Sequence, residues 1–159
     1  MPAIEIFKEE LQGEQRKMAL SALPSFTAAD NQLIQSVVGM LPDPAAITAL
    51  GRIGKEATAA VDALQAIESG DDASLSYEAS KSLWQITGEA KFAIAVVRAI
   101  LKQNQYEQGE IRVEDRQKIW ESLRYLHSTE DPAAKELLLK VEKGRFPNLR
   151  SFVRQLGEG

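Results

Sequence analysis

The sequence predicts an all-α chain, arranged as a right-handed α-α superhelix (a HEAT-like solenoid) of about four helix pairs with capping helices. Apolar residues recur at helical spacing along the 159 residues, and no strand-like alternation runs far enough to form a sheet. Glycines, prolines and short polar clusters separate these stretches. Residues 49–67 also align without a gap to residues 82–100, at an offset of 33 that is typical of helix-pair repeats.

Capping signals set the expected helix bounds. Asp43 and Asp131 each precede a proline, which combines an N-cap carboxylate with a first helical residue that needs no N–H donor. Gly54, Gly70 and Gly144 follow apolar stripes, and we expect them to end their helices in the left-handed conformation. Helices are expected at 4–11, 14–23, 27–41, 44–53, 55–68, 74–87, 89–103, 113–128, 132–143 and 148–156.

These helices group into repeats within a single domain over residues 1–159. The expected pairs lie at about 14–41, 43–68, 74–103 and 113–143, with caps at 4–11 and 148–156. Residues on the apolar stripes are expected to be buried, among them Leu50, Ile53, Val61, Leu64, Leu83, Ile86, Ile94 and Val97.

The junction between the two helices of a repeat carries a family resemblance. Residues 49–57, ALGRIGKEA, resemble this junction in HEAT-like repeats of the phycobilin-lyase type, and residues 82–90, SLWQITGEA, form a degraded copy. The resemblance is good over about 43–103 and fair over 113–143. It implies a right-handed α-solenoid whose second helices line a concave face, and it says little about activity because such repeats are mostly scaffolds.

Composition excludes several classes of active site. The chain has no cysteine and one histidine, which removes thiol chemistry, cysteine-ligated metals and multi-histidine sites. His127 is expected near a helix C-terminus, where its cation is favoured by the helix dipole. Asp71 and Asp72 form a carboxylate pair, but further ligands at usable spacing are missing, so a helix start explains them better. We therefore predict no catalytic residue, no metal and no cofactor.

Net charge and hydropathy limit the classes of partner that we expect the chain to bind. A net charge of −4 disfavours a general affinity for nucleic acid or anionic lipid. No apolar run approaches the roughly 20 residues that span a bilayer. The first five residues have neither a basic nor an apolar leader-like region, so we expect a cytoplasmic protein without membrane association.

The candidate binding residues are basic and lie on one helix and near the C-terminus. Lys91, Arg98 and Lys102 follow one line of the helix at 89–103, opposite its apolar stripe. From 140 to 156 the chain carries five basic residues and one acid, a net charge of +4 (5 − 1), and Arg150 and Arg154 would continue the surface. The pattern favours an acidic partner, although any solvated helix face carries charges. The five basic residues of this stretch are Lys140, Lys143, Arg145, Arg150 and Arg154.

Three aromatic residues are open to two interpretations. Tyr77 and Trp84 lie seven residues apart on one helix, and Trp120 lies on the first helix of the next repeat. Packing between repeats is favoured because aromatics make up only 6% of the chain. Alternatively they are possible aromatic anchors for a partner.

Taken together, these features favour a non-enzymatic protein-protein interaction module that binds a partner on its concave second-helix face. The resemblance also suggests a bilin lyase or isomerase-like HEAT-repeat protein. A HEAT-like nucleic-acid binder is a further alternative, although only one second helix and the C-terminal segment are basic.

Overall fold

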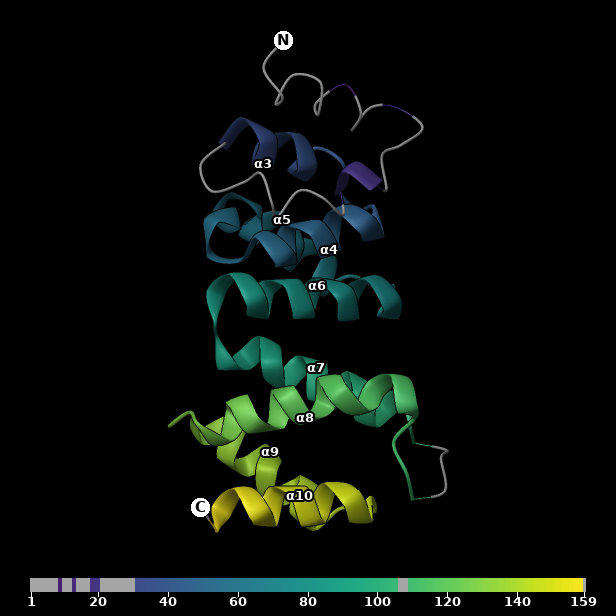
Figure 1. Cartoon of the computed structure of the whole chain (residues 1–159), viewed down its shortest axis with the longest axis vertical. Helices are drawn as coiled ribbons and strands as arrows, with labels where there is room; N and C mark the ends of the chain where they lie inside the picture. The colour runs from purple at the N-terminus through teal and green to yellow at the C-terminus, as the bar shows by residue number, and fades with distance from the viewer. Residues whose placement is uncertain (1–8, 10–12, 14–17, 21–30, 106–108, 159) are drawn as a thin grey trace. The chain divides into compact units, whose positions relative to one another are not determined.

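The computed structural model describes residues 9, 13, 18–20, 31–105 and 109–158. All regular secondary structure in these residues is helical (Figure 1), which confirms the all-α prediction. The expected N-terminal cap and the helix at 14–23 lie largely outside the described residues. The chain divides into two compact units, an N-terminal unit of residues 1–88 and a C-terminal unit of residues 89–159.

The described N-terminal unit is built around α6. This helix packs against α4, η2 and α5, while α3 packs against α4 and η2. Its core includes the fully buried side chains of Leu33, Ile47, Leu50, Leu64 and Leu83. The elements are α3 (Asn31–Val38), α4 (Pro44–Ile53), η2 (Gly54–Ala60), α5 (Val61–Glu68) and α6 (Ala73–Thr87).

Aspartate caps begin two of these helices. Asp43 Oδ1 accepts hydrogen bonds from the Ala45 and Ala46 amides at 2.8 and 3.4 Å. Asp72 Oδ1 accepts from the backbone amides of the second and third residues of α6 at 2.9 and 3.0 Å. Each carboxylate satisfies donors that have no partner inside the helix. The helix-start interpretation of the Asp71–Asp72 pair is therefore confirmed for Asp72.

The helix expected at 55–68 is divided in two. Residues Gly54–Ala60 form the 3-10 segment η2, with a kink at Ala57, and the α-helix α5 begins only at Val61. A 3-10 helix has three residues per turn, so Ala57 and Ala60 lie on the same side, and both are fully buried. The tighter period buries this small-residue pair. The neighbouring Ile53 and Val61 were expected in the core, but they are only half-buried. The change from the α-helical to the 3-10 period turns them partly away from the core.

Gly51 marks a close approach between α4 and α6. A Cβ built there would lie 2.4 Å from Gln85 Oε1, 2.6 Å from Ser82 Oγ and 3.0 Å from Ser82 Cα. Ser82, itself buried, donates a hydrogen bond of 2.8 Å to the Ile47 carbonyl oxygen of α4. The absent side chain at residue 51 thus lets the two helices approach closely enough for this bond.

The C-terminal unit is a second group of packed helices. α7 packs against α8 and α9, α8 against α9 and α10, and α9 against α10. Asp131 caps α9, as expected, by accepting a 2.8 Å hydrogen bond from the Ala134 amide. The elements are α7 (Ala90–Gln103), α8 (Val113–His127), α9 (Pro132–Glu142) and α10 (Pro147–Gly157).

The three expected left-handed glycine caps are wrong. Gly54 follows α4 with a positive φ of 72°, but its ψ of −138° lies outside the left-handed helical region, and Gly70 and Gly144 do not have a positive φ. The helices before Gly70 and Gly144 are capped by Ser69 and Lys143 in right-handed helical conformation, so no left-handed residue is needed there. The remaining expected core residues are buried: Leu50, Leu64, Leu83, Ile86, Ile94 and Val97.

Candidate binding groove

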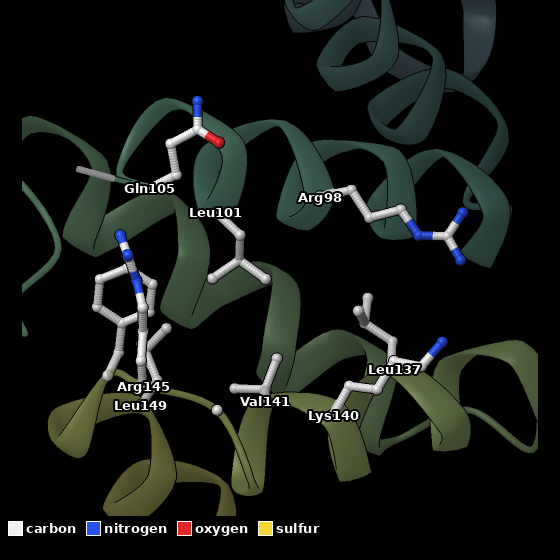
Figure 2. A pocket seen from close by; sticks show the side chains of 10 residues that line it. Arg98, Leu101, Gln105, Leu137, Lys140, Val141, Arg145 and Leu149 are labelled. Carbon is white, nitrogen blue, oxygen red and sulfur yellow. The ribbon is translucent and has the colours of Figure 1, made fainter. Parts of the chain in front are cut away.

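A groove of about 420 Å³ lies in the C-terminal unit between α7 and the segment that runs from α9 into α10. Its floor is apolar. In Figure 2, Leu101 of α7 points toward Val141 of α9, and Leu137 and Leu149 lie on the α9 and α10 side. The volume falls in the range of about 300–1,000 Å³ that ligand clefts occupy.

The local sequence builds the lower wall of this groove. Leu137 and Val141 are four residues apart on α9, so they share one face of that helix. The chain then turns at Gly144, where an added Cβ would lie 3.1 Å from the Lys140 carbonyl oxygen. Pro147 starts α10 at a first-turn position that suits proline. This short turn sets Arg145, Phe146 and Leu149 beside α7.

Three cationic side chains line the groove, and none of its described lining residues is acidic. Arg98 comes from α7, Lys140 from α9 and Arg145 from the turn after α9. Arg145 is held in place because its Nη2 donates a 2.5 Å hydrogen bond to the Asn104 carbonyl oxygen. Its guanidinium also lies 4.8 Å from the ring centroid of Phe146, at a distance suited to a cation–π contact.

One carboxylate stands next to the lining residues. Glu136 forms a 2.6 Å ion pair with Lys140, one helical turn away on α9. The hydrogen bond from Lys140 and its positive charge lower the pKa of Glu136, and the charge of Arg98 contributes in the same direction. Arg98 is therefore close enough to Glu136 to interact with it electrostatically. Glu136 remains ionised at neutral pH and partly balances this end of the groove.

A buried polar network supports the other end. Asn104 is fully buried, and its Nδ2 donates to the Ile100 carbonyl oxygen and to Asp115 Oδ2, both at 2.8 Å. Its Oδ1 accepts from the Arg112 amide at 2.8 Å. Arg112 in turn donates to Asp115 Oδ2 through Nε and Nη2 at 3.2 and 3.0 Å. The network fixes Asn104, the residue that follows α7, and the carbonyl oxygen of Asn104 binds Arg145.

Sequence reasoning missed Asn104, Arg112 and Asp115 as a group. The sequence offered only a weak indication that these three residues interact. Asn104 follows the last apolar residues of its helix, and Arg112 and Asp115 have the spacing of three that suits an ion pair at a helix start. Nothing in that spacing shows that the asparagine lies between them.

The structure brings only one of the five expected binding residues into the groove. Arg98 lines it. Lys91 is exposed and pairs with Glu89 at 2.8 Å, and Lys102 is exposed outside the lining. On α10, Arg150 is half-buried, and Arg154 is exposed and pairs with Glu142 of α9 at 3.3 Å. The other groove cations, Lys140 and Arg145, belong to the basic stretch that the sequence showed, although they were not among the expected site residues.

The aromatic residues lie elsewhere. Tyr77 and Trp84 are half-buried on α6, and Lys81 Nζ lies 4.8 Å from the ring centroid of Tyr77. Trp120 of α8 is 40% exposed and stacks on Phe152 of α10, with ring centroids 6.0 Å apart. A second hollow of about 520 Å³ surrounds Trp120. It is lined by Val113, Arg116, Gln117, Trp120, Glu121 and Arg124.

The described residues offer neither a metal cluster nor a membrane-spanning helix. They contain no group of three or more His, Asp or Glu side chains placed to hold a metal ion. In the same part of the chain, no helix has both the length and the apolar character needed to cross a membrane. Comparisons with family models, curated proteins and solved structures find no match to this chain.

Proposed function

We propose that this chain is a non-enzymatic protein-interaction module of the HEAT-like solenoid type, which acts in the cytoplasm and binds an acidic segment of a partner protein. The groove between α7 and α9 is the proposed site. The observation that carries the proposal is the combination of an apolar floor with three cationic side chains, Arg98, Lys140 and Arg145, and no acid among the described lining residues. The 33-residue repeat supports the solenoid assignment.

The two kinds of lining residue have different roles in this proposal. Burying apolar surface stabilises a complex by roughly 25 cal/mol per Å² before the costs of association are subtracted. Leu101 and Val141 supply such surface at the centre of the groove. The cations select acidic partners and speed their approach, an effect that salt weakens. A partner that is acidic and has exposed apolar side chains binds both the cationic and the apolar residues of the groove.

A selection from a random peptide library tests this function. The full chain is compared with a triple variant in which Arg98, Lys140 and Arg145 are changed to glutamate. We expect the parent chain to enrich peptides that combine carboxylates with large apolar residues, and we expect these peptides to lose binding to the variant. No enrichment over an empty support, or equal binding to parent and variant, would contradict the proposal. Circular dichroism confirms that the variant is folded.

The parent chain and the triple variant also test the alternative function as a bilin-binding protein. A linear tetrapyrrole is apolar and carries carboxylates, so the chemistry of the groove accepts it in principle. An absorbance titration of the parent chain with a bilin separates the two functions. A red-shifted, saturable complex that is lost in the triple variant would replace the peptide function by a tetrapyrrole one.

A further inference from the structure

We propose that the groove is selective for a helical partner segment that carries two carboxylates seven residues apart with large apolar residues between them. This inference rests on the proposed function and specifies the chemistry of its partner. The proposed ligand has an acid at position i, apolar residues at i+3 and i+4, and an acid at i+7. Such residues share one face of an α-helix.

The charge balance assigns one carboxylate to each end of the groove. At one end, Arg98 and Lys140 contribute two positive charges and Glu136 one negative charge, which leaves +1 (2 − 1). At the other end, Arg145 contributes +1, and its guanidinium donates a hydrogen bond to a neutral backbone carbonyl oxygen. Leu101, which points toward the apolar side chains of α9, lies between the two ends (Figure 2). One carboxylate at each end balances the charge of these described residues, whereas two at one end leave the cation at the other end unmatched.

The distance between the charges at the two ends of the groove determines how far apart the two ligand carboxylates must be. The guanidinium of Arg145 is bound at Asn104, six residues beyond Arg98, and six residues of helix advance about 9 Å. In Figure 2 the Arg98 side chain extends away from the Arg145 end, so 9 Å is a lower bound for the separation of the charges. Helical positions i and i+7 are about 10.5 Å apart, whereas i and i+4 are only about 6 Å apart. The longer helical spacing therefore matches the groove.

A helical segment suits this groove better than an extended one because the groove lies between helices. The side chains of an extended segment alternate between faces, so residues that point into one groove are two or four apart, about 7 or 13 Å at roughly 3.3 Å per residue. A spacing of two residues is too short for a separation of at least about 9 Å, whereas a spacing of four reaches it. A helix lays its apolar stripe along a groove between two other helices, which is an established mode of peptide recognition.

Glu136 is an internal competitor in this arrangement. Its carboxylate already occupies Lys140 at 2.6 Å, and a ligand carboxylate must share or displace that contact. Removing the charge of Glu136 leaves Arg98 and Lys140 both available to the ligand. Glu130 offers a matched control, because it forms an equally short 2.6 Å ion pair with Lys135 and neither residue lines the groove.

Two designed helical peptides test the order of residues. The first has glutamates at i and i+7 with leucines at i+3 and i+4. The second has the same composition, but both glutamates are placed beside each other at one end of the leucine pair. Fluorescence anisotropy with the full chain is expected to show about two- to tenfold tighter binding of the first peptide, since each end charge contributes an exposed ion pair. Equal affinities would overturn the spacing while leaving the proposed function intact.

Single variants test the two-ended arrangement. Glu136→Gln is expected to tighten binding of the first peptide by about two- to fivefold, and Glu130→Gln is expected to leave it unchanged. Arg98→Gln and Arg145→Gln should each weaken it by a similar factor. If neither designed peptide binds although the library selection succeeds, this inference is wrong and the function stands. If Glu136→Gln has no effect or weakens binding, the internal competition is refuted.

Discussion

Replacing Asn104 with alanine should destabilise the C-terminal unit strongly, because this side chain completes a buried network that a truncation cannot rebuild. The Arg112 amide loses its 2.8 Å acceptor, and an unsatisfied buried donor costs about 1–3 kcal/mol. The hydrogen bond to Asp115 is also lost, although Arg112 still holds that carboxylate. The Ile100 carbonyl oxygen keeps the Asn104 amide as its donor. We therefore expect a total loss of about 2–4 kcal/mol, a large part of the roughly 5–15 kcal/mol of a typical domain.

Urea unfolding measures this loss directly. With a slope of about 2 kcal/mol per M, the midpoint of the transition that reports on the C-terminal unit should fall by about 1–2 M. Trp120 reports on this unit when the fluorescence is recorded in a Trp84→Phe background, since Trp84 lies on α6 of the N-terminal unit. The control is Asn148→Ala, which changes an exposed asparagine on α10 and should shift the free energy of unfolding by less than about 0.5 kcal/mol. If Asn104→Ala behaves like this control, the network does not stabilise the fold and the argument for a fixed Arg145 fails.

Three further predictions concern stability and ionisation. Leu83→Ala removes a fully buried side chain and should lower the free energy of unfolding by about 2–5 kcal/mol in urea melts; a loss below about 0.5 kcal/mol would contradict its place in the core. Gly51→Val should cost at least about 1–3 kcal/mol through overpacking against α6, since even a Cβ would lie 3.0 Å from the Ser82 backbone; an unchanged thermal midpoint would refute the close approach. Hydrogen bonds from Lys118 and then Gln117 lower the pKa of Glu121, so its carboxylate should titrate below 4.5 by NMR and move upward in Lys118→Met. The associated stability is present above the pKa of the unfolded chain and disappears as the pH falls through the lowered folded value. An unshifted midpoint would contradict it.

Local signals predicted the helices well because the physics that sets them is local. Asp43 and Asp131 lie two or three residues from the amides that they cap, so their roles can be read from adjacent positions. The apolar periodicity likewise identified Leu50 and Leu83 as core residues, since each helix must bury one face. For this reason the bounds of α4 and of α6 to α10 agree with expectation within one or two residues.

The departures from expectation depend on neighbours that the sequence does not show. The segment 54–60 has helical composition, and only its packing against α3, α4 and α6 selects the tighter 3-10 turn that buries Ala57 and Ala60. The buried position of Asn104 depends on Arg112 and Asp115, eight and eleven residues away across a loop. A polar residue at a helix end is usually solvated, so the sequence alone favours the wrong environment for Asn104.

The groove shows how a charged helix face differs from a binding site. A solvated face predicts that each cation has an acidic neighbour close by, and Lys91 meets that expectation with Glu89. Arg98 has no acidic residue three or four positions away on its own helix, where Ile94, Ala95, Leu101 and Lys102 stand, and the carboxylate that it interacts with is Glu136 of α9. Arg145 donates to a neutral backbone carbonyl oxygen, which fixes its position without neutralising its charge. Such a cation is held ready for an anion at low entropic cost, and it was missed because residues 104 and 145 are brought together only by the packing of α7 with α9.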